Sequence, residues 1–386
     1  MITIEGIFST GVPILIFILI LGIVVFVHEF GHFIMARRAG IFVEEFAMGM
    51  GPKLLAFRGK KKAKNALEGE EDVTLYTLRL LPVGGFCKMR GMEENIPNDP
   101  ESMGNKSVFD RILVIAGGSA MNFILAFIIF TVLAFLGGFL TPTVIGIAED
   151  SPAQAAGLQI GDRVTHINNT RVTLWENLRF TLDMNGGQEM NVRIRRNSQR
   201  MTLTMTPQQG SDGVYRIGFS PDVLVGFLDR NELVSNEEIE FRRAGIGASV
   251  GNAVEMIGFN IRLPFRLLAR LITRQPMPAG AGVQSVIGIA GEVTEIYQIT
   301  IQHGIMPTVL TMLSIAGLIS VALGTMNLLP IPALDGARLI FLIIEGIRRK
   351  PVSQEREGMV HFAGFVLLMV LLVVVAGRDI VNLIQR

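Results

Sequence analysis

The chain has 386 residues, a formal net charge of +1 and a mean hydropathy of +0.46. Charged residues make up 18 % of it, whereas about a quarter of the residues of a soluble domain are charged. The balanced charge gives no basis for nucleic-acid binding, and the single cysteine, Cys87, excludes an internal disulfide and is expected to be a small buried hydrophobe. The shortage of charge falls in a few long windows, which predicts membrane spans with soluble pieces between them rather than two or three soluble domains.

The first uncharged window, 6–27, has about the length that a helix needs to cross the hydrocarbon core. A cleavable signal peptide is the alternative, but no basic residue precedes this window and no small-residue cleavage site follows it. Three further windows have the same character: 112–140, 303–329 and 359–376, the last interrupted only by His361. Four spans predict that both termini lie on the same side of the membrane.

Lysine and arginine are concentrated after the first span, between residues 37 and 64, and after the third, between residues 338 and 350. Positive charge marks cytoplasmic loops, so we expect both of these segments to be cytoplasmic. The termini and the long region 141–302 are then expected to lie outside, since long domains cross a membrane largely regardless of their charge.

The end of the first span carries the sequence His28-Glu29-Phe30-Gly31-His32. Residues four apart share a helix face, so both imidazoles can reach one ion, and neutral imidazole nitrogens suit Zn²⁺. Glu29 is placed to act as a general base beside the first ligand. A chance match at a membrane interface is the alternative, but three ionisable residues at the end of a membrane helix are costly and usually functional.

A catalytic zinc needs a third protein ligand and one open position. The remaining histidines are poor candidates, because His166 falls in a soluble segment and His303 lies at the opposite end of the third span. A carboxylate is more suitable, and we expect it after the third span, on the side of the membrane where the first span ends.

Asp335 meets that requirement. Pro330 and Pro332 precede it and should interrupt the helix, and irregular backbone at membrane depth is tolerated only where protein or a water-filled cavity covers it. The alternative is that Asp335 caps a helix over 337–346. The need for a third ligand favours the metal site.

The His28-Glu29-x-x-His32 motif and the segment Asn327-x-x-Pro330-x-Pro332-x-Leu334-Asp335-Gly336 resemble the two motifs of the site-2 proteases, in particular the bacterial regulator-of-sigma branch with a single PDZ domain (RseP- and RasP-like). The resemblance covers nearly the whole chain. It implies that His28, His32 and Asp335 hold one catalytic Zn²⁺ and that Glu29 is the base. It also implies that Asn327 is catalytic and helps hold substrate or the developing oxyanion, a suitable role for a side-chain amide.

Region 43–92 is rich in glycine and in strand-forming residues, and 60–72 is expected to be an exposed turn. Its segments 46–52 and 82–89 resemble the membrane-associated β-hairpin of the family. We expect Gly84 and Gly85 to bind substrate, because an open sheet edge beside the zinc could accept an unwound peptide as an added strand. The alternative is a hairpin that only packs against the helices.

Two segments depart from the family pattern. Gly118-Ser119 stands before Asn122 where the family often has Gly-Pro, and 285–289 lacks the usual proline. Neither departure touches the expected zinc site.

The segment from Ser151 to Asp162 resembles the start of a bacterial PDZ domain, which predicts such a domain over 141–209 with strands at 190–195 and 201–205. PDZ domains take an extended segment or a free C-terminus onto a sheet edge. The resemblance implies a filter that admits trimmed substrates, and a purely structural module is the alternative.

Arg262, Arg266 and Arg270 are spaced by four and predict one basic helix face. We expect an amphipathic helix on the outer membrane surface over 237–275, with a solvated helix face as the alternative. Pro264 is expected to kink or divide this helix.

The expected fold is a multi-pass α-helical membrane protein with about four transmembrane helices, a membrane-associated β-hairpin and an inserted extracytoplasmic PDZ domain. The expected segments are 1–38, 43–92, 110–140, 141–209, 237–275, 303–336 and 358–378.

The resemblance implies an intramembrane zinc metalloprotease of the cell membrane. Its expected partners are the lipid bilayer and single-span membrane substrates such as anti-sigma factors or remnant signal peptides. One alternative is a catalytically silent scaffold that binds peptides through its PDZ domain. A cation transporter is a weaker one, because the central runs of the second and fourth spans lack a carboxylate.

Overall fold

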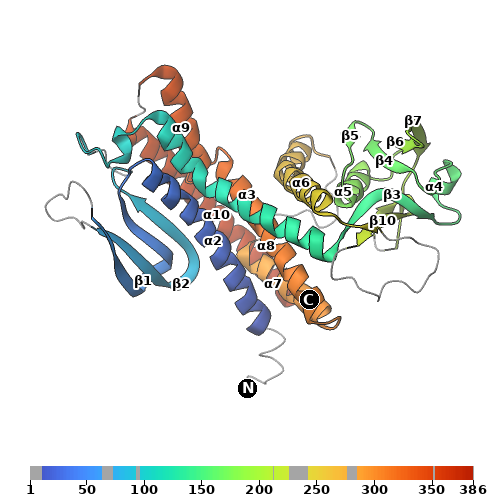
Figure 1. Cartoon of the computed structure of the whole chain (residues 1–386), viewed down its shortest axis with the longest axis horizontal. Coiled ribbons are helices and arrows are strands. Elements are labelled where there is room, and N and C mark those ends of the chain that lie inside the picture. The colour runs from blue at the N-terminus through green and yellow to red at the C-terminus, as the bar shows by residue number, and fades with distance from the viewer. Residues whose placement is uncertain are drawn as a thin grey trace. The chain divides into compact units, whose positions relative to one another are not determined.

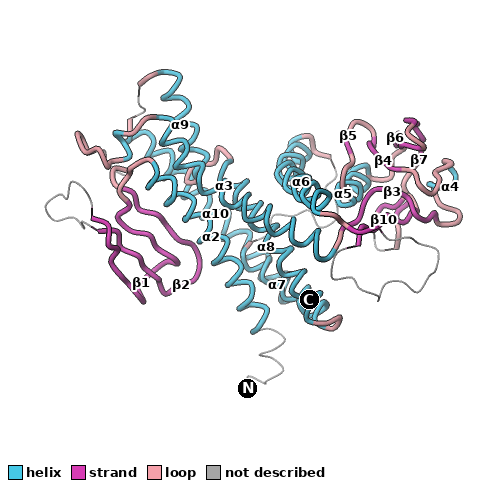
Figure 2. Tube along the Cα trace, in the orientation of Figure 1, coloured by secondary structure: helices cyan, strands magenta, loops and turns pink. Residues whose placement is uncertain are grey.

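The computed structural model describes residues 11–62, 73–92, 96–211, 213–225, 242–275, 285–350 and 353–385. The chain divides into two compact units, Met1–Ala126 with Val283–Arg386, and Phe127–Gly282. Figures 1 and 2 follow the chain through both. Most of the expected turn over 60–72, and the start of the expected helix over 237–275, lie outside the described residues.

Among the described residues, four helices are long and apolar enough to cross a membrane. They are α2 (Val12–Arg38), α3 (Val108–Gly137), α8 (Ile305–Leu328) and α10 (Gln354–Gln385). The described part of each expected apolar window falls largely on one of these helices, although α3 ends at Gly137 and α8 begins at Ile305, inside their windows. The α10 helix extends beyond 358–378 because polar residues at both ends of the apolar stretch continue it.

Small residues allow the backbones of α2 and α3 to touch. A Cβ atom built on Gly31 would lie 2.2 Å from the carbonyl oxygen of Gly117, so neither helix has room for a side chain there. A hydrogen bond from the Ser320 hydroxyl to the Asn122 carbonyl, 2.8 Å long, joins α8 to α3. These contacts hold together the helices that carry the two sequence motifs.

The first unit also contains a short helix that the sequence analysis did not anticipate, α7 (Val286–Ile301). It packs against α2, α8 and α10. The side chain of Ser285 caps its first turn, and the carboxylate of Asp379 accepts a 2.7 Å hydrogen bond from the Ser285 backbone N–H. The α9 helix (Asp335–Arg348) follows α8 after a short turn.

Beside α2 lie two long antiparallel strands, β1 (Val43–Lys62) and β2 (Val73–Met89), as Figure 2 shows. Both strands bend, so that 43–48 pairs with 85–89 and also with 75–78. Glycines with positive φ occupy the bends, Gly49 and Gly84 both at +82°. The outer edge next to 43–48 is therefore formed by 85–89.

Phe46, Cys87 and Ile115 belong to the buried cluster that joins the hairpin to α2 and α3. Cys87 is 7 % exposed, and burial raises the pKa of its thiol. The expectation that Cys87 is a buried, hydrophobic side chain is confirmed.

The second unit is built on a sheet of β3 (Phe139–Ile147), β4 (Arg163–Ile167), β6 (Met190–Arg196), β7 (Gln199–Met205), β10 (Phe219–Val225) and β11 (Arg242–Arg243). The strand order is β11-β10-β3-β4-β6-β7, and β5 (Thr170–Arg171) pairs with β4. A separate pair is formed by β8 (Gln208–Gln209) and β9 (Tyr215–Arg216). Two helices, α4 (Pro152–Ala155) and α5 (Trp175–Asn185), complete the unit's central part.

The expected strands at 190–195 and 201–205 are present as β6 and β7. The sheet continues past residue 209, however, because β10 pairs with β3 in the antiparallel sense. This strand returns from a distant part of the chain, so local periodicity gave no sign of its partner.

The amphipathic region forms α6 (Ile246–Ile272), which packs on α5 through an edge-to-face contact of Phe259 with Phe180. Of the two effects expected of Pro264, a kink or a division, the division is wrong, because one helix runs through the proline. Contacts on both sides of the proline hold the helix in place. Phe259, before the proline, packs on Phe180, and Arg270, after it, donates a hydrogen bond to the Met184 carbonyl.

Candidate metal centre

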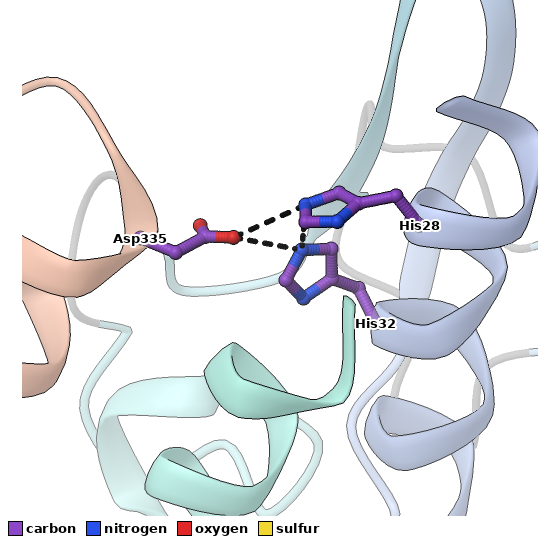
Figure 3. A group of neighbouring side chains, drawn as sticks. All are labelled: His28, His32 and Asp335. Atoms are coloured by element: carbon purple, nitrogen blue, oxygen red, sulfur yellow. Dashed lines mark hydrogen bonds and ion pairs between the residues drawn. The ribbon is translucent and has the colours of Figure 1, made fainter. Parts of the chain in front are cut away.

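His28 and His32 of α2 and Asp335 at the start of α9 meet at one point, although 307 residues separate His28 from Asp335. The Nε2 atoms of the two histidines lie 3.2 Å apart, and each lies 3.2 Å from Oδ2 of Asp335. Figure 3 shows the three side chains pointing toward one another. The three potential ligand atoms therefore form a nearly equilateral triangle. The triangle is largely buried, because both histidines are only 6 % exposed.

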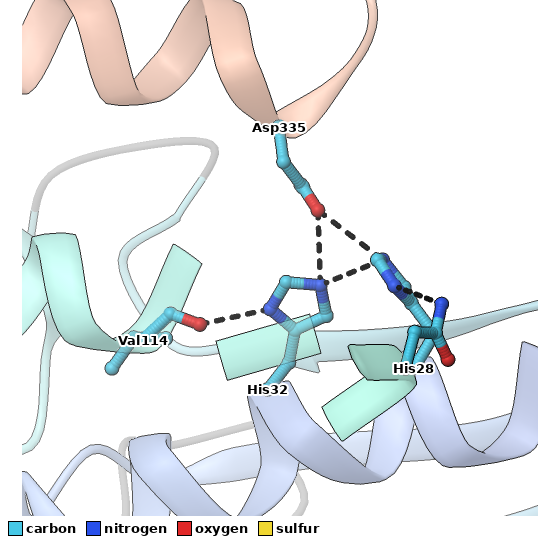
Figure 4. Close-up of polar contacts among 5 residues, drawn as sticks. His28, His32, Val114 and Asp335 are labelled. Carbon is cyan, nitrogen blue, oxygen red and sulfur yellow. Dashed lines mark hydrogen bonds and ion pairs between the residues drawn. The ribbon is translucent and has the colours of Figure 1, made fainter. Parts of the chain in front are cut away.

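Two further contacts orient the imidazole rings (Figure 4). Nδ1 of His32 donates a 2.9 Å hydrogen bond to the Val114 carbonyl, which leaves Nε2 with a free lone pair. Nδ1 of His28 lies 3.2 Å from the side-chain amide nitrogen of Asn122, whose Oδ1 is buried without a hydrogen-bond partner. With the two ends of that amide exchanged, Oδ1 accepts a hydrogen bond from the Nδ1–H of His28. Both Nε2 atoms are then free to bind a metal ion.

Gly118 of α3 leaves room beside the triangle. A Cβ atom at this position would lie 2.4 Å from Nε2 of His32 and 2.8 Å from Nε2 of His28. Any other residue would place a side chain against both of the atoms that face Asp335.

The segment between α8 and α9 is irregular, as the two prolines predict, and it presents Asp335 to the histidines. Leu334 is the N-cap residue of α9 and Asp335 is the first residue of the helix. The alternative that Asp335 caps this helix is therefore wrong.

The triangle opens onto a cavity of about 740 Å³. The other residues predicted to act at the site, Glu29, Asn327, Gly84 and Gly85, all line this cavity. A Cβ atom on Gly85 would lie 3.2 Å from Cγ of Glu29, so the outer segment of β2 runs directly beside Glu29. The structure thus brings all seven predicted residues to one place, Asn327 and Gly84 as lining residues of the cavity.

The donor set fits a zinc ion. Two imidazole nitrogens and one carboxylate are a known ligand combination of catalytic zinc. Ligand atoms about 2.0–2.1 Å from a tetrahedral zinc lie roughly 3.3 Å from one another, close to the 3.2 Å spacing of these three atoms. The cavity beside them leaves a fourth position open.

Sequence reasoning did not assign a role to Asn122, Gly118 or Arg338, which lie against the triangle or line the cavity. An amide in an uncharged membrane window is a signal for Asn122, since such a group requires a polar partner. A glycine at a helix contact gives no comparable signal, because its effect depends on what lies opposite.

Comparison with known proteins gives a consistent result. Residues 16–371 match the family described as Peptidase family M50. The chain is 32 % identical to zinc metalloprotease RasP of Shouchella clausii, over 96 % of this chain and 99 % of the relative. It is 28 % identical to the regulator of sigma-W protease RasP of Bacillus subtilis, over 96 % of this chain and 98 % of the relative. The resemblance to the regulator-of-sigma proteases is confirmed.

Among solved structures, the PDZ domain of an SdrC-like protein from Listeria monocytogenes covers 22 % of this chain, and the match spans 86 % of that domain, with 16 % identity and a TM-score of 0.19.

Proposed function

This chain belongs to peptidase family M50, and from that premise we propose that it is an intramembrane zinc protease whose metal is held by His28, His32 and Asp335. The observation that carries the proposal is the triangle of ligand atoms, 3.2 Å on each side, at the buried end of a membrane-type helix. When bound, a zinc ion acidifies water and polarises the carbonyl of a peptide bond.

The chain's own residues move the proton and orient the metal ligands. Glu29 lines the cavity beside the triangle, where its carboxylate can take a proton from the attacking water and later deliver it to the leaving amine. Asn122 and the Val114 carbonyl fix the two imidazoles so that Nε2 of each points inward. We assign no direct chemical role to either of them.

Asn327 and the outer segment of β2 are proposed to bind the substrate. The amide of Asn327 lines the same cavity and is suited to donate to the oxygen that develops charge. Gly84 and Gly85 leave the strand edge bare next to Glu29, so that an unwound peptide could pair with this edge and place its carbonyl in the cavity.

The hairpin exposes an apolar surface that suits a lipid environment. Met50, Leu54, Leu55 and Phe57 are each between 49 % and 63 % exposed. Large exposed apolar patches mark membrane or protein contacts, so we propose that this part of β1 enters the bilayer. With the positive residues assigned to the cytoplasm, the metal centre lies toward the cytoplasmic side, and the termini and second unit lie outside.

For the second unit we propose a PDZ role. It would present the edge of its sheet to a free C-terminus or an extended segment of the substrate. The proposed substrates are single-span membrane proteins, of which anti-sigma factors and remnant signal peptides are the candidates, and α6 is proposed to lie on the membrane surface.

The rival function is a silent scaffold that binds peptides and cleaves none. It predicts that the metal-site residues can be replaced without loss of function. The retained Glu29 beside a complete ligand set favours the enzyme.

The test uses the purified full-length chain with a model single-span substrate in detergent micelles. We expect Glu29→Gln to abolish cleavage and to retain one zinc ion per chain, measured by elemental analysis. Glu149→Gln, an exposed carboxylate change elsewhere, is the matched control and should cleave normally. Unchanged cleavage by Glu29→Gln would reject Glu29 as the base, and a zinc-free, inactive wild type would reject the enzyme.

A further inference from the structure

The turn that delivers Asp335 to the metal centre contains a residue in an unfavourable conformation. Ala333 has φ = +76°, in the region that residues with a side chain rarely adopt. A strained backbone of this kind persists only when surrounding contacts over-determine it. Within the turn, Leu334 donates a 3.1 Å hydrogen bond to the Ile331 carbonyl, but the amide of Ala333 points away from it.

That amide is held by the last helix. The backbone N–H of Ala333 donates a 3.0 Å hydrogen bond to Nδ1 of His361 in α10. Because Nδ1 accepts, the neutral imidazole carries its proton on Nε2, which lies 3.9 Å from Glu357 one turn earlier. The ring of Phe341 in α9 lies 6.1 Å from the His361 ring on another side.

A second contact from the same face of α10 is independent of the hydrogen bond. Gly364 follows His361 by three positions and so shares its face. A Cβ atom on Gly364 would lie 2.1 Å from Cβ of Pro332 and 2.8 Å from its carbonyl oxygen. The backbone of α10 therefore touches the turn directly.

These contacts are unusual for this helix. Only 6 % of its most apolar window is buried within the chain, so most of its surface is available to lipid. An ionisable side chain in a membrane-type helix usually has a function. The His361 side chain is 17 % exposed and contacts Ala333, two residues before Asp335.

We propose that His361 and Gly364 are positioning residues, which seat the turn 331–334 and so fix the carboxylate of Asp335 at its distance from His28 and His32. The inference rests on the proposed function, in that Asp335 is taken to be a metal ligand. His361 itself does not touch the ion or the substrate. It acts through one backbone hydrogen bond, and Gly364 acts through the space that it leaves for Pro332.

The test measures zinc affinity of the full-length chain by competition with a chelator, alongside cleavage. His361→Leu removes the acceptor and keeps the bulk, and we expect zinc affinity to fall about 10- to 100-fold, the range found for residues that orient metal ligands. His361→Asn places an amide oxygen near the Nδ1 position and should restore most of that affinity. Phe362→Ala, on a side chain that is 70 % exposed, is the matched control and should bind zinc as the wild type does.

Gly364→Ala provides a second variant that leaves His361 in place. We expect it to weaken zinc binding and to lower kcat more than it changes KM, because it displaces a metal ligand and not the residues proposed to bind the substrate. Unchanged zinc affinity in His361→Leu and Gly364→Ala, with only a lower unfolding temperature of the metal-free protein, would overturn the inference. Failure of the wild type to bind zinc would instead overturn the proposed function.

Discussion

Gly118 of α3 faces Nε2 of His32 so closely that a methyl group on Gly118 would lie 2.4 Å from this nitrogen. We therefore predict that Gly118→Ala, a single added carbon, lowers zinc affinity at least about 10-fold, since it displaces ligand atoms that must converge. Elemental analysis of the purified variant after dialysis against a weak chelator checks this.

Gly22→Ala is the control for a glycine replaced within the same group of helices. A Cβ atom at Gly22 meets no atom within 4 Å. This variant should keep its zinc and gain about 0.5–1 kcal/mol of stability from the lower flexibility of the unfolded chain. Equal zinc content in the two alanine variants would show that α2 and α3 are further apart than described.

Asn122→Ala removes the amide next to Nδ1 of His28. We expect the ring to lose its fixed orientation and zinc affinity to fall about 10- to 100-fold. The control is Ser320→Ala, which removes only the hydrogen bond to the backbone carbonyl of Asn122. That control should cost about 1 kcal/mol of stability and leave zinc affinity unchanged. Equal zinc affinity in the wild type and Asn122→Ala would contradict the role of the amide.

Removal of the metal should lower the free energy of unfolding by an amount that grows with the logarithm of the zinc affinity. A free zinc concentration 100 times the dissociation constant stabilises the folded wild type by about 2.7 kcal/mol. Asp335→Ala should lose this zinc-dependent rise in unfolding temperature, whereas Glu149→Ala should retain it. A full rise in Asp335→Ala would remove Asp335 from the ligand set.

The hairpin should be sensitive to acid through Glu45. Burial of its carboxyl acts to raise the pKa, but hydrogen bonds from Thr77 and Arg79, both 2.7 Å long, bring it below the ordinary 4.5. A carboxyl whose pKa is lower in the folded than in the unfolded chain stabilises the fold at pH values above its ordinary pKa. This stabilisation is lost as the pH falls through the lowered pKa.

Unfolding temperatures measured downward from pH 6 check this prediction. As the pH falls, the wild type should lose about 0.5–1.5 kcal/mol of its free energy of unfolding. Glu45→Gln lacks this contribution already at pH 6. Glu44→Gln is the control. Glu44 lies on the other side of the strand and pairs with Lys88, whose side chain is 52 % exposed. Identical pH profiles for the wild type and Glu45→Gln would exclude this source of acid sensitivity.

The four long apolar helices and the meeting of His28, His32 and Asp335 were predictable because most of these features rest on a strong local signal. Charge-free windows of helical length require a membrane, and two histidines four residues apart share a face wherever the helix lies. The place of Asp335 beside the histidines was predictable from chemistry, since a catalytic zinc on two imidazoles calls for a third protein ligand.

Other features depended on distant partners and had no local signal. The strand Phe219–Val225 is defined by its pairing with Phe139–Ile147. The close approach of Gly364 to Pro332 is a property of two segments together. His361 was visible as an interruption of an apolar window, but only its contact with Ala333 suggests why it stands there.

The distance of 307 residues between His28 and Asp335 has a consequence for biosynthesis. The ribosome makes the two histidines long before the carboxylate, and it makes α10, which contacts the turn, later still. A nascent chain therefore lacks the complete set of candidate ligands until Asp335, 307 residues after His28, has been made. A product that ended before α10 would lack the contacts of His361 and Gly364 with the turn, and we expect its candidate metal site to bind zinc weakly.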